Sequence, residues 1–343
     1  MGACYNFPMK VSDAGEFGLI NRLDTVVNSA PGARQRRQQL LIGIGDDAAA
    51  WPGNGLTQLA TTDSLIQDVH FSLDTTSWEE LGWKAMAVNL SDIAAMGGIP
   101  EYALISLAIP GDTAVEDVVS MYRGMVALAA DFNVAIAGGD TCRSPVVAIT
   151  VTVLGTSGSD SLPVLARSGA RPGDKIAVTG YLGAAAGGLK MLTQKLDAKP
   201  EVKARLSQAF LRPCPRITEG RQLAKLGVLA AIDISDGLIS DLMHICEMSQ
   251  VGARIEIDRV PVDPLLKTWL GSESLEMALA GGEDYELLFT ASTDIINNIK
   301  QAVSCPVSII GEITAGDAGK VTMVDSNGRP FSLKKAGWEH FIT

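Results

Sequence analysis

Strand and helix signals alternate along almost the whole chain, and this alternation is the feature that most constrains its fold. Short β-branched or apolar runs, such as residues 102–109 and 146–155, are separated by longer apolar-patterned stretches with helix start and stop signals. Such alternation is typical of α/β architecture, in which helices pack on the faces of a sheet. It recurs on both sides of a segment rich in Gly, Ser and Pro at 157–173. We therefore predict two α/β domains, residues 1–156 and 157–343.

Two capping boxes mark helix starts in the first half. Ser77 with Glu80, and Thr113 with Glu116, have the spacing at which two side chains satisfy free backbone N–H groups reciprocally. They predict helices that end near residues 96 and 132. Predicted strands are 58–63, 69–72, 102–109, 134–137 and 146–155 in the first half, and 175–179, 229–234 and 285–290 in the second.

The overall charge argues against nucleic acid as a partner, because the net charge is −11 and the pI about 4.8. The five cysteines have no CxxC spacing, which argues against a disulfide framework or a zinc site and favours the reducing cytoplasm. Residues 1–20 have no apolar core of the kind found in signal peptides. The most apolar stretch, 85–109, contains charged residues and Pro100, so we expect a buried helix and a strand there rather than a membrane span.

Aspartates recur beside glycine or small residues at predicted strand ends and strand–helix junctions. Ligand sites of α/β folds lie at the carboxyl ends of strands, and carboxylate oxygen is the ligand that Mg²⁺ prefers. Each aspartate alone is typical of a turn or a helix cap. Their joint pattern predicts a site for divalent cations, and its members are Asp46, Asp47, Asp63, Asp140, Asp233 and Asp236.

Asp92 differs from these because it lies within an otherwise apolar helix. An unpaired carboxylate is costly in such surroundings. We therefore expect a partner for Asp92, which is either a metal ion or a buried salt bridge with Lys84 or Arg167.

Other motifs are less informative. The glycine-spaced turn at 180–188 has neither the Lys-Ser/Thr of a Walker loop nor strict GxGxxG spacing, which favours close backbone packing over phosphate binding. Arg167 lies in the predicted interdomain segment, where it either forks onto a phosphate or forms a surface ion pair. The sequence has no nucleophile elbow and no HExxH motif, so nothing in it indicates acyl transfer or zinc hydrolysis.

Ten short motifs follow one another in a distinctive order from Gly15 to Phe341. They are GEFGLINRL (15–23), IGDDAA (44–49), TTDSLIQDVHF (61–71), KAMAVNLSDIAAMG (84–97), GGDTCR (138–143), ARSGARPGD (166–174), RPCPR (212–216), AIDISDGLISDL (231–242), LAGGEDYELLFT (279–290) and GWEHF (337–341). Together they resemble the thiamine-monophosphate kinase family of the aminoimidazole-ribotide-synthetase-like superfamily.

That resemblance implies a two-domain α/β (α+β) fold with mixed sheets flanked by helices. It implies a homodimer formed through the N-terminal domains, with ATP across a cleft that holds several Mg²⁺ ions. The N-terminal domain would bind metal and ATP, and the C-terminal domain would complete the ATP and substrate site. The reaction implied is phosphorylation of thiamine monophosphate to thiamine diphosphate in a cytoplasmic enzyme, without nucleic acid or membrane partners.

The resemblance also implies roles for individual residues. The metal ligands would be Asp47, Thr61, Thr62, Asp63, Asp92, Asp140, Asp233 and Asp236. ATP would contact Tyr122, Gly139, Asp140, Arg167 and Ser235, and the substrate side would consist of His70, Glu283 and Trp338. No covalent catalytic residue is expected.

The residue chemistry suits that reaction. A phosphate monoester is already largely dianionic at neutral pH, so the nucleophile needs no general base. The obstacle is repulsion between two polyanions, which several Mg²⁺ ions bound by carboxylates can overcome. Trp338 could offer a ring face to the thiazolium cation, and Glu283 a complementary charge.

Alternatives stay open within and outside the superfamily. An aminoimidazole-ribotide-synthetase-like enzyme would activate an amide oxygen with ATP. Selenophosphate synthetase would need a reactive Cys and Lys beside a glycine-rich arm; Cys4 is present, but the arm is not. The hydrogenase-maturation relative would carry a C-terminal cysteine, whereas this chain ends EHFIT. A non-catalytic nucleotide- or metal-binding regulatory protein is the alternative from another class.

Overall fold

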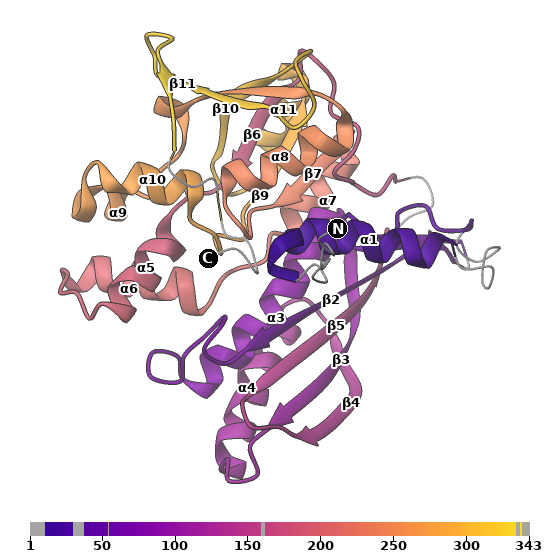
Figure 1. Cartoon of the computed structure of the whole chain (residues 1–343), viewed down its shortest axis with the longest axis vertical. Coiled ribbons are helices and arrows are strands. Elements are labelled where there is room, and N and C mark those ends of the chain that lie inside the picture. Colours follow the sequence, from indigo (N-terminus) through magenta and orange to yellow (C-terminus); the bar gives the residue numbers. More distant parts are fainter. Residues whose placement is uncertain (1–10, 30–37, 54, 159–161, 334–336, 338–343) are drawn as a thin grey trace, which may run out of the picture.

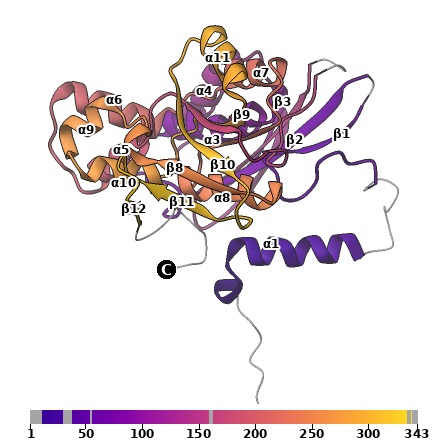
Figure 2. The same cartoon turned by 90° about the horizontal axis from the view of Figure 1, so that it is seen from above.

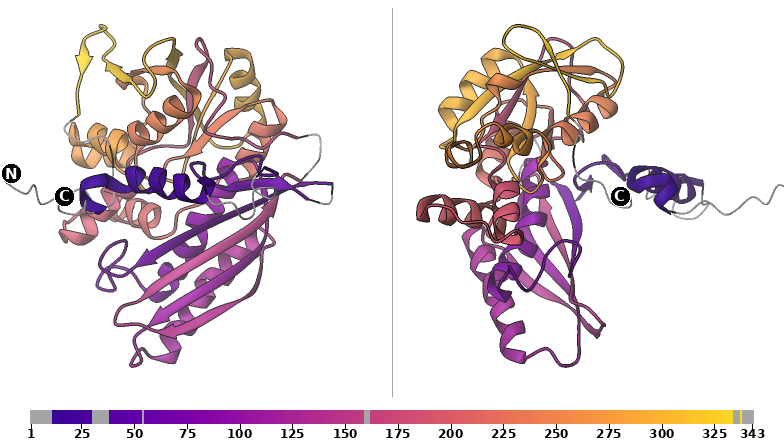
Figure 3. Two further views of the ribbon diagram at one scale, coloured as in Figure 1. Left: turned by 45° about the vertical axis from the view of Figure 1, so that its right-hand side comes forward. Right: turned by 60° about the vertical axis from the view of Figure 1, so that its left-hand side comes forward.

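The computed structural model describes residues 11–29, 38–53, 55–158, 162–333 and 337. It contains two sheets, one in the lower and one in the upper part of Figure 1. The first is a five-stranded sheet with the order β1-β2-β5-β3-β4, in which β3 and β4 are parallel and the other pairs antiparallel. Its strands are β1 (Ala49–Pro52), β2 (Thr57–Ile66), β3 (Ile99–Ile109), β4 (Ala135–Arg143) and β5 (Ala148–Thr156). Helices α3 (Trp78–Ala95) and α4 (Val115–Asp131) pack against one face, as Figure 3 shows.

The second sheet has seven strands in the order β12-β11-β8-β10-β6-β9-β7, and β11–β8 is its parallel pair. Its strands are β6 (Lys175–Thr179), β7 (Ala230–Asp233), β8 (Gly252–Glu256), β9 (Leu287–Ala291), β10 (Val307–Thr314), β11 (Val321–Val324) and β12 (Pro330–Phe331). The accompanying helices are α5 (Ala184–Thr193), α6 (Pro200–Leu211), α7 (Ile217–Lys225), α8 (Leu238–Ser249), η1 (Ile257–Arg259), α9 (Pro264–Leu270), α10 (Glu273–Ala280) and α11 (Thr293–Ala302). The predicted fold class, mixed sheets flanked by helices, is confirmed.

Helix α1 (Val11–Ser29) stands apart from the main body in Figure 2. Gly15 interrupts its helical backbone with φ 68°. The Phe17 ring lies 4.2 Å from the His244 ring of α8, measured between centroids. This ring contact joins the first half of α1 to helix α8. No helix of the described chain is both long and apolar enough to span a bilayer.

Three local predictions were wrong. Residues 69–72 form a turn closed by the Gln67–Phe71 bridge rather than a strand. The second capping box is absent, because Ala114 is the N-cap of α4 and makes no side-chain cap. Strand β4 continues through Gly138 and Gly139, where the sequence predicted its end. Both glycines have positive φ, and a Cβ at Gly139 would lie 1.8 Å from the Ile105 carbonyl oxygen, so these glycines permit strand pairing instead of ending it.

Helix α3 lies at the centre of the molecule and positions the candidate site. Its capping box of Ser77 and Glu80 is present as predicted. It is buried along most of its length because it touches the first sheet, α4 and also α7 and β7 of the second unit. Several of its buried residues are polar, namely Lys84, Asn89 and Ser91. Buried polar groups need partners. Asn89 and Ser91 form hydrogen bonds with other elements, and Lys84 forms an ion pair.

The crossing of α3 and α4 depends on two glycines. A Cβ at Gly82 would lie 1.8 Å from the Met121 carbonyl oxygen, and one at Gly124 would lie 1.9 Å from the Glu79 carbonyl oxygen. We expect Gly124→Ala to force the helices apart and to lower the free energy of unfolding by about 1–3 kcal/mol. Urea unfolding followed by circular dichroism measures this. Gly43→Ala is the control, since its new Cβ meets only Leu40 Cδ1 at 3.7 Å, and equal stability of both variants would contradict the close-packing account.

Candidate active site

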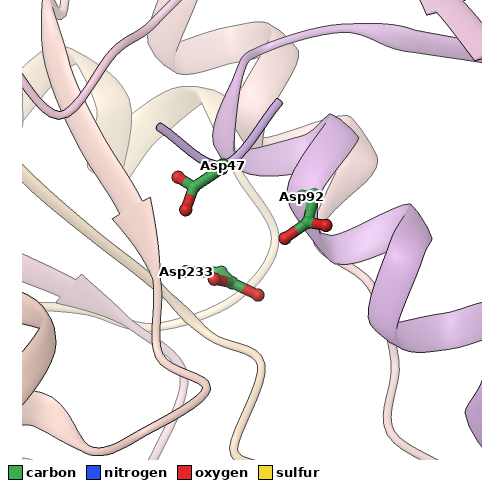
Figure 4. Close-up of side chains that lie close together, drawn as sticks. All are labelled: Asp47, Asp92 and Asp233. Carbon is green, nitrogen blue, oxygen red and sulfur yellow. The ribbon is translucent and has the colours of Figure 1, made fainter. Parts of the chain in front are cut away.

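Three aspartates from distant parts of the sequence converge between the two sheets. Asp47, Asp92 and Asp233 each offer one carboxylate oxygen, and these oxygens all lie within 4.8 Å of one another (Figure 4). Asp47 lies just before β1, Asp92 lies on α3, and Asp233 is the last residue of β7. Both units of the chain therefore contribute to one cluster.

Helix α3 and strand β2 hold this cluster in place. The Ser91 hydroxyl donates to Asp233 Oδ2 at 2.6 Å, across the boundary between the units. The Thr61 hydroxyl donates to Asp92 Oδ2 at 2.5 Å. The Asp63 backbone N–H donates to Asn89 Oδ1 at 2.9 Å, and this bond fixes β2 against α3 with the Asp63 carboxyl next to Asp92.

Arg167 supplies positive charge at the edge of the cluster. Its Nε and Nη2 both donate to Asp47 Oδ1, at 3.1 and 2.5 Å, and its backbone N–H donates to Asp46. The other carboxylate oxygen of Asp47, Oδ2, is buried and has no hydrogen-bond donor among the described residues. A buried carboxylate oxygen without a donor is costly and indicates a place for a cation.

The suggested salt bridge of Asp92 to Lys84 or Arg167 was wrong. Arg167 pairs with Asp47, and Lys84 pairs with Glu283 at 2.6 Å between Nζ and Oε1. Thr61 and Asp63 are the neighbours of Asp92 instead. Of the two partners expected for Asp92, a metal ion therefore remains.

Burial and mutual repulsion raise the pKa values of these carboxyl groups. Burial is the larger cause, and it raises the pKa of Asp233 to about 8 with a further contribution from the charge of Asp47. The pKa of Asp92 lies well above its ordinary value for the same two reasons, with Asp63 as the first contributing charge. Burial also raises the pKa of Asp47. The pKa of Asp63 is raised by nearby protein and by the charge of Asp47, although the residue as a whole is still exposed to solvent.

Four carboxyl groups thus face one guanidinium, that of Arg167. The donor set consists of hard oxygen atoms, which suits Mg²⁺. Within the described residues, no second basic side chain forms an ion pair with these four carboxyl groups. Divalent cations would compensate the excess negative charge, so the residues present fit a magnesium site.

The loop after β7 places further predicted residues beside the cluster. Ser235 and Asp236 lie two and three residues after Asp233, and the Ser235 carbonyl accepts a hydrogen bond from the Glu283 N–H at 2.8 Å. Asp241, at the start of α8, accepts from the backbone N–H groups of Asp236 and Gly237 at 3.3 and 3.0 Å. This loop is therefore held at both ends.

Sequence reasoning did not recognise Lys84, Asn89, Ser91 and Asp241 as residues that position the site, and it gave Asp46 no part beyond membership of the aspartate set. Asn89 and Ser91 lie in the motif NLSD and Asp241 in DISDGLISDL, so polar residues within buried motifs were the available signal. Their partners lie on other elements, which the sequence does not reveal.

Two predicted metal ligands lie away from the cluster in the single chain. Thr62 points to the sheet face opposite the helices, where its hydroxyl lies 2.9 Å from that of Thr152. Asp140 is exposed on the edge strand β4, in a row that continues through Ser106 and Thr150 to Ser64 of β2. Three strand spacings separate its backbone from β2, which corresponds to about 14 Å. Neither Asp63 nor Asp140 ends its strand, contrary to expectation.

The other predicted residues are also placed. Gly139 neighbours Asp140 on β4, and Tyr122 is half-buried in α4, where it packs against the core. His70 lies in the turn after β2, and its Nδ1 accepts from the Ile66 N–H at 3.0 Å. Trp338 lies outside the described residues.

The glycine-spaced turn before α5 serves packing, as predicted. A Cβ at Gly188 would lie 2.2 Å from the Leu206 carbonyl oxygen. The helix N-terminus already holds an anion, because the Asp284 carboxylate accepts from the N–H groups of Gly183 and Ala185 at 2.6 and 3.2 Å. A bound phosphate would have to displace this carboxylate.

Known proteins share this architecture. Residues 45–157 match the family model "AIR synthase related protein, N-terminal domain", and residues 171–324 match the corresponding C-terminal domain model. A solved structure of AaThiL complexed with AMPPCP and TMP superposes with a TM-score of 0.84 at 32% identity, covering 98% of this chain and 100% of that one. Hydrogenase maturation protein HypE has the same fold, with a TM-score of 0.69 at 20% identity over 87% of this chain and 94% of that chain.

The fold and both family models define an AIR synthase related protein. Thiamine-monophosphate kinase of Bacillus subtilis (strain 168) is 37% identical over 88% of this chain and 93% of its own length. That of Escherichia coli (strain K12) is 38% identical over 96% of this chain and 99% of its own length. The chain belongs to the thiamine-monophosphate kinase family.

Proposed function

We propose that this chain phosphorylates thiamine monophosphate to thiamine diphosphate with ATP and Mg²⁺ by direct in-line transfer. The observation that carries the proposal is the convergence of Asp47, Asp92 and Asp233, together with the buried carboxylate oxygen of Asp47 that has no hydrogen-bond donor among the described residues. The relatives' name and the complex of AaThiL with AMPPCP and TMP support the choice of both substrates.

The carboxylates would hold the metal ions and the guanidinium would hold phosphate. Asp47, Asp63, Asp92 and Asp233 are the proposed ligands at the cluster, with Asp236 close by in sequence. Bound Mg²⁺ supplies positive charge that lets two phosphoryl groups approach each other. Arg167 has a planar fork of donors that suits a phosphate of ATP when it turns away from Asp47.

The transfer needs no covalent intermediate on the protein. The acceptor phosphate is largely dianionic at neutral pH, so no side chain has to remove a proton from it. The described residues of the cluster supply carboxylates and one guanidinium, which act by binding and orientation. Detection of a kinetically competent phosphorylated side chain would contradict direct transfer.

We propose that the protein acts as a homodimer and that Asp140 of the partner subunit completes each site. Asp140, with Gly139, lies on an exposed edge strand on the far side of the sheet from Asp63. The face of the sheet away from the helices exposes Tyr102, Leu104 and Leu154, which a second copy would cover. We also propose residues 1–156 as the metal-binding, ATP-binding and dimerisation domain, and residues 157–343 as the domain that completes the ATP and substrate site.

Mixing inactive variants tests this arrangement. Asp63→Asn and Asp140→Asn are each expected to be inactive alone. If a site combines Asp63 of one subunit with Asp140 of the other, a hybrid dimer has one intact site, and an equimolar mixture recovers about one quarter of wild-type activity. Activity is measured after subunit exchange, with two separately purified Asp63→Asn preparations as the control. A mixture that stays inactive although hybrid dimers form would place both residues in the same subunit's site.

A turnover assay tests the function itself. We expect thiamine diphosphate from ATP, Mg²⁺ and thiamine monophosphate, and no phosphorylated product from free thiamine or from aminoimidazole precursors. Product from an aminoimidazole precursor would favour the aminoimidazole-ribotide-synthetase-like alternative. ATP binding without turnover of any acceptor would favour a regulatory nucleotide-binding protein.

A further inference from the structure

Helix α3 buries a lysine that neither the metal cluster nor the phosphate-binding residues use. The Lys84 side chain is 1% exposed, and its Nζ lies 2.6 Å from Oε1 of Glu283. The same Nζ lies 3.7 Å from the centroid of the Phe210 ring on α6. The contact therefore joins the first unit, through α3, to the loop before β9 and to a helix of the second unit.

Burial of an ammonium group is costly unless an opposite charge and further contacts compensate it. Glu283 supplies the charge, and the face of the Phe210 ring supplies a cation–π contact. An apolar residue would fill this space without the cost of burying a charge and would need neither of these compensating contacts. The ammonium group is directed at Glu283, so the chemical effect of Lys84 falls on that carboxylate.

Glu283 is held in an unusual backbone conformation. Its φ is +69°, and Tyr285, two residues on, has φ +49°. The Glu283 N–H donates to the Ser235 carbonyl at 2.8 Å, and the Tyr285 N–H donates to the Ile234 carbonyl at 2.9 Å. Such backbone strain persists only where surrounding contacts fix it, and it is concentrated at functional sites. The carboxylate is thus fixed at its backbone by the β7 loop and at its tip by Lys84.

Lys84 and Glu283 differ in how far their side chains are exposed to solvent. The Glu283 side chain is 26% exposed, against 1% for Lys84, so Glu283 faces outward from the buried lysine. With Lys84 at 2.6 Å, the negative charge of Glu283 is already balanced. What the carboxylate still offers to a ligand is a hydrogen-bond acceptor.

We propose that Lys84 is a positioning residue that holds Glu283 as a charge-balanced acceptor for a neutral N–H group of the substrate. Given the proposed function, on which this inference rests, that group is the amino group of the aminopyrimidine ring of thiamine monophosphate, rather than the thiazolium cation. Oε1 engages Lys84, and Oε2 accepts from the amino group.

Steady-state kinetics of three variants test the positioning role. Lys84→Met keeps the packing on Phe210 and removes the charge. We expect Lys84→Met and Glu283→Gln each to raise KM for thiamine monophosphate by about tenfold or more, with KM for ATP within about twofold of wild type. The double variant is expected to be no worse than Lys84→Met, because the two residues act as one unit. Lys203→Met, at an exposed position of α6, is the matched control and keeps wild-type kinetics.

An altered substrate tests what Glu283 recognises. We use the analogue of thiamine monophosphate in which oxygen replaces the pyrimidine amino group and the thiazolium ring is unchanged. The wild-type enzyme is expected to prefer thiamine monophosphate by about 10²-fold in kcat/KM, since a site built to accept an N–H bond rejects an analogue that lacks it. Glu283→Gln, whose amide can also donate, is expected to reduce that preference to within about threefold.

Several results would overturn the inference. One is a lower Tm of Lys84→Met with unchanged KM for thiamine monophosphate, which would make Lys84 purely structural. Another is a parallel rise of both KM values. Equal discrimination against the analogue by wild type and Glu283→Gln would exclude the acceptor role. If Lys84→Met does not fold, Lys84→Gln replaces it, because its side-chain amide keeps an N–H donor toward Glu283. This variant is expected to raise KM for thiamine monophosphate less than Glu283→Gln does. An equal or larger rise would also count against the inference. Wild-type protein without turnover of thiamine monophosphate would refute the proposed function instead.

Discussion

Replacement of Asp92 by Asn is expected to lower kcat by about 10³-fold or more, because it removes a carboxylate at the meeting point of the cluster. Asn is nearly isosteric and still accepts the hydrogen bond from Thr61, so the fold is retained. Without metal, the Tm of the variant is expected to equal or exceed that of wild type, because one of several mutually repelling carboxyl groups becomes neutral. Turnover at saturating ATP and thiamine monophosphate, with thermal unfolding of metal-free protein, measures both effects.

The matched control is Asp112→Asn, an exposed aspartate in the loop between β3 and α4. It makes the same chemical change outside the cluster and is expected to keep wild-type turnover. Asp63→Asn should behave like Asp92→Asn, because the two carboxyl groups are neighbours. Near-normal activity in both cluster variants would remove the metal-cluster model.

Magnesium is expected to stabilise the protein strongly at high pH and weakly at low pH. The folded-state pKa of Asp233 is about 8, above the ordinary value of 3.8, so the folded state binds a proton more tightly than the unfolded state. Its contribution to stability is present at low pH and is lost as pH rises through about 8. The metal-free Tm should therefore fall by about 5 °C or more between about pH 5.5 and about pH 8. Saturating Mg²⁺ should raise Tm at about pH 8 by about 5–10 °C, because ions bind the deprotonated carboxylates of the folded state.

Thermal unfolding across a grid of pH and Mg²⁺ concentrations measures this linkage. Asp92→Asn is the informative comparison, since it should have a shallower pH dependence and a smaller response to Mg²⁺. Ca²⁺ and monovalent salt at matched ionic strength separate specific binding from screening. A metal-free Tm that rises steadily over this pH range would contradict the assignment of raised pKa values to the cluster.

The sequence was sufficient for features whose signals are local. The capping box of Ser77 and Glu80 located α3, and apolar β-branched runs located β3 and β5. Local rules failed where pairing overrode them. Gly138 and Gly139 predict the end of a strand in isolation, yet both lie within β4. Each has a positive φ, and the missing side chain of Gly139 permits close approach to β3.

The sequence predicted the candidate site as a set of aspartates, but it did not predict which side chains form ion pairs with one another. The sequence grouped Asp47, Asp92 and Asp233 as candidate ligands, and these three carboxyl groups do lie together. A metal ion as the partner of Asp92 stays a prediction. The sequence could not show that Arg167 pairs with Asp47 while Lys84 pairs with Glu283, because ion pairing depends on distances between separate elements. Asp140 illustrates the same limit, since its exposed edge position becomes visible only in the folded sheet.

Helix α3 has a consequence for how this chain can be recombined with its relatives. Its polar side chains reach out in different directions, with Ser91 meeting Asp233, and Lys84 meeting Glu283. A chimera that joins the first unit of one homologue to the second unit of another must inherit these pairs intact. A chimera joined in the connecting segment is expected to fold only if the two parent proteins have matching residues at both positions of each pair. The contacts of α3 therefore determine which halves can be exchanged.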